Sequence, residues 1–325
     1  MYRSLMVPLD SSAFGEYALP LALGIARQAG ASVELIHICT PPIPSVFADG
    51  LLSPALVEPP IELAEEQAHA YLDQLTDRLS QRWNVPISTV VRYGRAADTL
   101  HAYALESAAD LVVMTTHGYG PLSRIWMGSV ADKLMRLLPM PILLTRPHEA
   151  AIDLLAEIHA PAFQHVLIPL DGSALAEEIV GPAVALGTLT GAQYTLLQAL
   201  DPLVAEHTNP PYSVGLDRAM LAEVREHALA YLEQIADRLR AQSLQVQTNL
   251  VVAQPHVAIL DYTHDHAVDL IAMATHGHGG VARMLLGSVA DKVVRSAGTP
   301  VLLRRPSAEA AEPRAAVDLR PPAPL

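Results

Sequence analysis

The sequence predicts an α/β protein with two tandem domains, each a doubly wound sheet of five parallel strands. Three observations predict this fold. The chain has 325 residues, a length that favours two domains. Short apolar runs alternate with helical patterns, which is typical of parallel strands joined by right-handed crossovers. Residues 114–147 also align with residues 273–306 without a gap, with 18 of 34 positions identical, so the chain contains a repeat.

The first half has five apolar runs with the length of buried strands. These runs are residues 2–9, 32–38, 86–92, 110–114 and 141–144. Helical spacing of apolar residues is found at 14–29, 61–82 and 96–106, and a further helix is expected after Gly128. The Pro-rich stretch at 41–60 is too long for an ordinary connection, so we expect a lid or a solvated insertion there.

The second half repeats this order. Its expected strands are residues 164–170, 194–199, 246–252, 269–273 and 300–303, and its clearest helices are 219–241 and 256–265. Asp171 follows Asp10 by 161 residues and Gly277 follows Gly118 by 159, and this near-constant offset indicates duplication of a whole domain. The predicted division is a first domain at 1–147, a linker at 148–161, a second domain at 162–306 and a disordered tail at 307–325.

Composition narrows the classes of partner. The formal net charge of −13 at pH 7 argues against nucleic acid or an anionic membrane surface as the main partner. The apolar runs are short and interrupted, so we expect no membrane span. The single cysteine, Cys39, excludes an internal disulfide, which fits a reducing compartment. We therefore expect a cytoplasmic protein that binds neither nucleic acid nor membrane.

The repeated stretch contains a glycine-bearing loop between a strand and a helix. Gly128 and Gly287 each precede Ser-Val-Ala-Asp-Lys, the expected start of a helix. The N–H groups at a helix N-terminus lack intrahelical partners, so such a loop can hold a phosphate. The helix dipole supplies about 0.3–1 kcal/mol, and several charge-assisted N–H bonds at about 1.5–3 kcal/mol each would contribute more. The alternative is that the loop is only a tight connection between strand and helix.

The loop resembles the ATP-binding signature of the universal stress protein family, Gly-x2-Gly-x9-Gly-Ser/Thr. The second glycine, the nine-residue gap and the Gly-Ser pair match in both halves. At the first glycine the chain has Thr115 and Ala274 instead, and the β-branched threonine is the larger departure. The resemblance spans residues 1–147 and 162–306. It implies Rossmann-like domains of the adenine nucleotide alpha hydrolase type, with strand order 3-2-1-4-5 and a ligand site between strands one and four.

The resemblance also implies roles for individual residues in binding ATP or another adenine nucleotide. Asp10 and Asp171, which end the first strand of each half, would contact the adenosine part. From the residues alone, each aspartate could equally be a helix N-cap or a turn residue. Residues that would flank the base or lie near it are Ile38, Ala199, Met114 and Met273. Thr115 and Ala274 hold the position where the backbone would approach the ribose. Residues whose backbone N–H groups would cradle the phosphates are Gly118, Gly128, Ser129 and Val130, and Gly277, Gly287, Ser288 and Val289. In some members of the family Mg²⁺ bridges the phosphates.

Two other groups of residues have competing interpretations. Arg124 and Arg283 occupy the same place in each loop and either reach a phosphate or stay solvated. The 14 histidines invite a metal site, but His264 and His266 are two apart on an expected helix and do not share a face. Since no cysteine or carboxylate cluster completes a site, we expect no metal ligands. His276, like its counterpart in the first half, is expected to hold the loop by hydrogen bonds.

Three functions remain open at the level of sequence. The first is a nucleotide-dependent sensor or regulator of a stress response. The second is a slow ATP hydrolase or a self-phosphorylating protein, for which the sequence offers neither a clear base nor clustered cations, so no catalytic residue is assigned. The third is an interaction scaffold without nucleotide. Because the family dimerises through its last strands, residues 141–144 are expected to pair with residues 300–303 within the chain, and the resemblance also allows a homodimer of whole chains.

Overall fold

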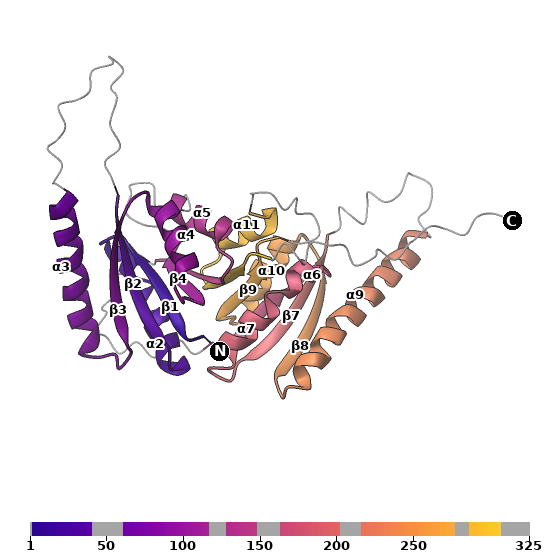
Figure 1. Cartoon of the computed structure of the whole chain (residues 1–325). Helices are drawn as coiled ribbons and strands as arrows, with labels where there is room; N and C mark the ends of the chain where they lie inside the picture. The colour runs from indigo at the N-terminus through magenta and orange to yellow at the C-terminus, as the bar shows by residue number, and fades with distance from the viewer. Residues whose placement is uncertain are drawn as a thin grey trace, which may run out of the picture.

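A computed structural model describes residues 2–40, 61–116, 128–147, 163–201, 216–276 and 286–306 (Figure 1). The expected insertion at 41–60, the linker at 148–161 and the tail at 307–325 lie outside the described residues. In the first half the elements are β1 (Ser4–Leu9), α1 (Ala13–Glu16), α2 (Leu19–Ala29), β2 (Ser32–Cys39), α3 (Ile61–Ser80), β3 (Ile87–Tyr93), α4 (Ala96–Glu106), β4 (Leu111–Thr115), α5 (Ser129–Leu137) and β5 (Ile142–Thr145).

The second half has the same order of strands and helices. Its elements are β6 (His165–Pro169), α6 (Ala174–Glu177), α7 (Val180–Gly187), β7 (Gln193–Leu200), α9 (Leu216–Arg240), β8 (Gln245–Val252), α10 (Pro255–Asp265), β9 (Leu270–Ala274), α11 (Ser288–Ser296) and β10 (Val301–Arg304).

The strands form one sheet in the order β3-β2-β1-β4-β5-β10-β9-β6-β7-β8. Within each half the strands are parallel in the order 3-2-1-4-5, which confirms the expected doubly wound topology. The halves meet where β5 and β10 run antiparallel, with Leu143 opposite Leu302 and Leu144 opposite Val301. The observed sheet therefore continues across the chain instead of ending at the boundary of each half.

One expected helix is wrong as a single element. The segment 14–29 consists of α1 and α2, which are separated at Tyr17 and Ala18. Pro20 lies in the first turn of α2, where its missing N–H costs nothing. In the interior of one long helix the same proline would remove a hydrogen bond and clash with the preceding turn. The second half has the same break between α6 and α7, with Pro182 in the first turn of α7.

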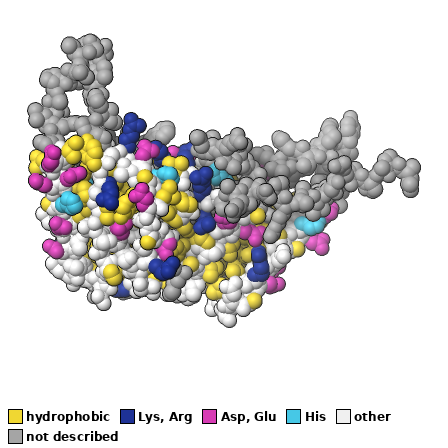
Figure 2. Space-filling view, viewed as in Figure 1, with side chains coloured by type: hydrophobic (Ala, Val, Ile, Leu, Met, Phe, Trp, Pro, Cys, Tyr) yellow, Lys and Arg dark blue, Asp and Glu magenta, His cyan; other side chains and the backbone are white. Residues whose placement is uncertain are grey.

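Helices cover both faces of the sheet, and each face has its own core (Figure 1). Alternate residues of a strand point to opposite faces, so Leu5 packs with α2 and α3 while Met6 packs with α4 and α5. Both side chains are fully buried, as is usual in parallel sheets covered on two sides. On the outer surface, acidic, basic and apolar side chains are interspersed on the face shown in Figure 2. Within the described ranges, no helix has the length and apolar character needed to cross a membrane.

Candidate functional site

The second half contains a cavity of about 290 Å³ at the carboxyl ends of its strands. It lies between β6 and β9, where the strand order of this half reverses. Doubly wound sheets bind their ligands at this place. The lining residues come from β6, β7, β9, α6, α10, α11 and the positions next to them. They are Pro169, Leu170, Asp171, Ala176, Leu197, Ala199, Pro255, Ile259, Met273, Ala274, Thr275, His276, Gly287, Ser288, Val289 and Ala290.

Most site residues expected in the second half meet in this cavity. They are Asp171, Ala199, Met273, Ala274, Gly287, Ser288 and Val289. Gly277 and Arg283 lie outside the described residues. In the first half the counterparts end β1, β2 and β4 or begin α5, and they are Asp10, Ile38, Met114, Thr115, Gly128, Ser129 and Val130. Gly118 and Arg124 are likewise outside the described part of the chain.

The start of α11 presents backbone donors to the cavity. Gly287 is the N-cap, and its own N–H donates to the carbonyl of Thr275 at 2.9 Å. The first intrahelical bond is from the N–H of Asp291 to Gly287 O, so the N–H groups of Ser288, Val289 and Ala290 have no intrahelical acceptor. These three N–H groups, rather than that of Gly287, are therefore the ones at the start of α11 that could donate to an anion. Gly128 at the start of α5 has the same arrangement, with its N–H 2.9 Å from Thr116 O.

The glycine at the helix start is required by a close backbone approach. A Cβ built on Gly287 would lie 2.7 Å from the carbonyl oxygen of Thr275, closer than any side chain tolerates. Its φ of −58° is open to every residue, so left-handed geometry is not the reason. The glycine thus holds α11 tightly against the end of β9. A tight connection and a phosphate loop are compatible here, because the close packing brings the helix N-terminus to the cavity.

The two aspartates brace the turns that follow β1 and β6. Asp171 Oδ1 accepts hydrogen bonds from Ser173 N at 3.0 Å and Ser173 Oγ at 2.6 Å. Ser173 Oγ in turn accepts from Ala176 N at 3.1 Å, which makes the serine the N-cap of α6. The N-cap interpretation of the aspartate is therefore wrong, and its turn interpretation is confirmed. Asp10 and Ser12 repeat this geometry in the first half.

One part of the cavity wall is apolar. Leu197 and Ala199 are two apart on β7 and face the same side of the sheet, toward Ile259 of α10 and Met273 of β9. Sequence reasoning missed the contribution of α10. The alternation of β7 places residues 197 and 199 on one face of the sheet, but only the structure shows that α10 covers that face. An apolar wall with polar groups at one end is typical of small-ligand sites.

Two further lining residues, Thr275 and His276, were not placed in the site from the sequence. Thr275 is fully buried, and its hydroxyl lies 3.0 Å from Nδ1 of His276. This contact joins the end of β9 to the beginning of the loop. Among the described residues, no group of three or more His, Cys, Asp and Glu side chains could hold a metal ion.

The two halves differ at six of the cavity positions that the repeat aligns, including three alanines of the second half. Ala199, Ala274 and Ala176 of the second half correspond to Ile38, Thr115 and Gly15 of the first half. Two of these three differences add side-chain atoms to the first half and one removes them. The Asp10 carboxylate occupies the space beside Gly15, since a Cβ there would lie 2.6 Å from Asp10 Oδ1. The two sites therefore have the same backbone plan and different side-chain packing.

Comparisons with known proteins agree with this duplicated architecture. The sequence profile of the Universal stress protein family matches residues 1–146 and again residues 162–305. A universal stress protein of Mycolicibacterium smegmatis is 27% identical over 312 residues, which cover 93% of this chain and 97% of that protein. Another from Synechocystis is 21% identical over 319 residues, covering 93% of this chain and 100% of that protein.

A solved structure shows the same fold. A universal stress protein from Archaeoglobus fulgidus superposes with a TM-score of 0.64 at 17% identity, covering 94% of this chain and 97% of that one. The fold, the strand order in each half and the double match of the family profile lead to one conclusion: the chain belongs to the universal stress protein family, with two family domains in tandem.

Proposed function

We propose that this protein binds ATP or another adenine nucleotide in the cavity of its second half, and that nucleotide binding makes it a sensor or regulator in a stress response. The observation that carries the proposal is the meeting of an apolar wall and the free end of α11 in one cavity, at the point where the strand order reverses. A nucleotide needs both surfaces, because its base is flat and apolar and its phosphates are anionic.

The volume and the lining residues of the cavity suit a ligand with an apolar base at one end and anionic phosphates at the other. At about 290 Å³ the cavity is at the lower end of the range for small-ligand sites, enough for a base and ribose. The base would lie against Leu197, Ala199 and Met273. The Asp171 carboxylate would accept hydrogen bonds from ribose hydroxyls. The phosphates would lie outside the apolar part, at the N–H groups of Ser288, Val289 and Ala290.

Net charge makes the backbone donors important. The chain carries a formal charge of −13, so its overall field does not attract an anion. Charge-assisted bonds to the three N–H groups, each contributing about 1.5–3 kcal/mol, offset this disadvantage. By the family resemblance, Gly277 and Arg283 would complete the phosphate site. In the first half, the N–H groups of Ser129, Val130 and Ala131 after the N-cap Gly128 would act in the same way, with Thr115 beside the ribose.

Cysteine content and strand pairing bear on where the protein is located and how it assembles. We propose a cytoplasmic protein, because its single cysteine needs no oxidising compartment. We also propose that the β5–β10 pairing joins the two domains in solution, and that any homodimer of whole chains forms through another surface. Since the strands through which the family dimerises are already paired within the chain, they are not available to a second copy.

The test is a calorimetric titration of the intact chain with ATP, AMP and cyclic AMP, each with and without Mg²⁺. Binding of at least one adenine nucleotide, and much weaker binding of adenosine, is the expected result because the phosphates contribute through α11. No heat with any of the nucleotides would overturn the proposal and leave an interaction scaffold. Phosphate release under saturating ATP and Mg²⁺ would identify the protein as a slow hydrolase instead of a pure sensor.

A further inference from the structure

Among the described residues, the ten-stranded sheet has two open edges, β3 at one end and β8 at the other. An open edge presents unpaired backbone groups that can pair with a strand of another chain. In this protein the central edges of the two halves are closed by the β5–β10 pairing, so β3 and β8 are where a second copy could add to the sheet.

The hydrogen bonds show which residues face outward at each edge. The N–H of Ala253, just after β8, donates to Leu200 O of β7, so Ala253 faces inward. Neighbouring residues of a strand alternate in direction, and the outward groups of β8 therefore belong to Val246, Thr248, Leu250 and Val252. At the other edge Gly94 N donates to Cys39 O, which by the same alternation gives an outward direction to Val91 and Tyr93.

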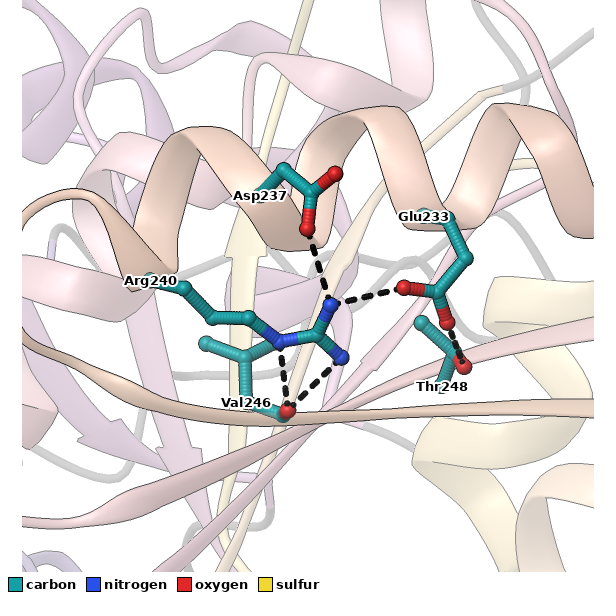
Figure 3. A network of polar contacts seen from close by, with 5 residues as sticks. All are labelled: Glu233, Asp237, Arg240, Val246 and Thr248. Carbon is teal, nitrogen blue, oxygen red and sulfur yellow. Dashed lines mark hydrogen bonds and ion pairs between the residues drawn. The ribbon is translucent and has the colours of Figure 1, made fainter.

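On β8, an arginine from α9 donates hydrogen bonds to one of these outward carbonyl groups (Figure 3). Nε and Nη2 of Arg240 donate to Val246 O at 3.2 and 3.1 Å. Nη1 of the same guanidinium donates to Glu233 Oε2 at 2.7 Å and Asp237 Oδ1 at 3.0 Å. Glu233 also accepts from Thr248 Oγ1, at 2.5 Å. The guanidinium fork is thus held in one orientation, with its charge against the free edge.

On β3, a different arginine does the same. Nη1 of Arg92 donates to the outward carbonyl of Val91 at 3.0 Å, and its guanidinium lies 5.0 Å from the ring centroid of Tyr103. The two arginines are not repeats of one another. The repeat aligns Arg240 with Ser80 and Arg92 with Val251, so each half carries an arginine that the other half lacks.

We propose that Arg240 and Arg92 protect the two open edges of the sheet and so prevent edge-to-edge pairing with a second copy of this chain. Duplication of the domain created two open edges from one ancestral edge. The arginine at each edge stands at a different position of the repeat, so inheritance of one arginine from the domain before duplication does not explain both. A charged side chain on an edge strand is an established means of preventing such pairing.

Sedimentation velocity of Arg240→Met, Arg92→Met and the double variant tests the proposal over a range of concentrations. Two β8 strands can pair antiparallel about a two-fold axis, which closes the assembly. Each single variant is therefore expected to form a species of twice the parent mass. The double variant exposes two edges per chain and is expected to form open-ended species that grow with concentration. Arg225→Met, which removes an exposed arginine from the same helix, is expected to sediment like the parent.

A second substitution identifies the surface used. Val252 is 41% exposed and its N–H faces outward, so proline there removes a donor that β7 does not need. In the Arg240→Met background, Val252→Pro is expected to restore the parent mass. The proposal is overturned if the folded double variant sediments as the parent does at every concentration, or if Val252→Pro leaves the association unchanged. If Arg240→Met does not fold, Arg92→Met tests the β3 edge by itself, because Arg92 is exposed and its substitution should not disturb folding. In that case the proposal is overturned if Arg92→Met has the mass of the parent protein.

Discussion

The guanidinium of Arg146 donates through Nη1 to the carbonyl oxygen of Arg295, at 3.2 Å. Arg146 follows β5 in the first half, and Arg295 lies in the last turn of α11 in the second half. The reverse contact also exists, because Arg305, after β10, donates to Leu137 O at the end of α5 at 3.4 Å. Each half thus places a positive charge at the carboxyl end of the other half's last helix, where the helix dipole favours it.

These reciprocal contacts predict a measurable loss of stability. Arg146→Ala and Arg305→Ala should each lower the free energy of unfolding by about 0.3–1 kcal/mol, the usual contribution of a cation at an exposed helix C-terminus. Urea unfolding measures the change, with Arg225→Ala as the control for removing a surface arginine. Values equal to the control would show that the two contacts contribute nothing.

The contact between the two domains predicts a coupling between residues on β5 and β10. Leu143 and Leu302 are paired in register, and both are fully buried. Each substitution by alanine should cost about 2–5 kcal/mol, and the double variant should deviate from additivity by about 0.5–3 kcal/mol. The control pair is Leu143 with Leu196, a buried residue on the distant strand β7, which should be additive. Additivity for Leu143 and Leu302 as well would contradict pairing of the domains in solution.

Gly287 predicts a contrast between two glycine substitutions. Gly287→Ala places a Cβ against Thr275 O and should destabilise the protein by about 1–3 kcal/mol, the cost of overpacking. Gly298 has open space where its Cβ would stand, so Gly298→Ala should be neutral or slightly stabilising. Thermal unfolding of both variants checks the contrast. Equal melting temperatures would mean that α11 moves away from β9 without cost.

His37 predicts a pH dependence of the stability of the protein. Burial lowers the pKa of His37, and the nearby Asp10 and the Leu9 backbone only partly oppose this. Because the folded-state pKa lies below the ordinary value of 6.5, the folded protein resists protonation of the ring. The stabilising effect is therefore present above pH 6.5 and is lost as the pH falls from there through the folded-state pKa.

The matched substitution for His37 is supplied by the repeat, which has Gln198 at this position. One proton changes the free energy of unfolding by at most about 1.4 kcal/mol per pH unit, and the partly exposed ring should contribute a fraction of that slope. His37→Gln should flatten the dependence of stability on pH between 6.5 and lower values. An unchanged slope in this variant would assign the dependence to other groups.

Periodicity and repeat spacing predicted most of the fold. Strands alternate with helices, and matching residues of the two halves, such as Asp10 and Asp171, have a near-constant offset. These two patterns were enough to predict two doubly wound domains. The break between α1 and α2 was missed because Pro20 was not weighed against the helical pattern around it. The N-cap stayed open between two interpretations because Asp10 and Ser12 are both good cap residues, and only three-dimensional geometry shows that Gly15 N donates to Oγ of Ser12.

The candidate site was predictable in part. The glycine and serine at the start of α11 carry a local signal, so their place at the strand-order reversal could be foreseen. Ile259 and Pro255 of α10 carry no such signal, because their contribution depends on how the helix packs over β7. The contact between Arg240 and Val246 O was also beyond sequence reasoning, since it depends on which backbone groups of β8 face outward.

If N–H groups at the start of α11 bind nucleotide phosphate, removing one of them must weaken ATP binding, and a calorimetric titration of Ser288→Pro with ATP measures this. Gly287 has ψ of 144°, which a following proline requires, and proline is favoured at the first helical position, so the helix should remain intact. Loss of this one donor is expected to weaken ATP binding by about 10- to 150-fold. Ser288→Ala, which keeps the N–H, should retain binding, and Ser129→Pro should leave the second-half site unchanged. Wild-type affinity for ATP in a folded Ser288→Pro variant would mean that the N–H of Ser288 does not bind phosphate.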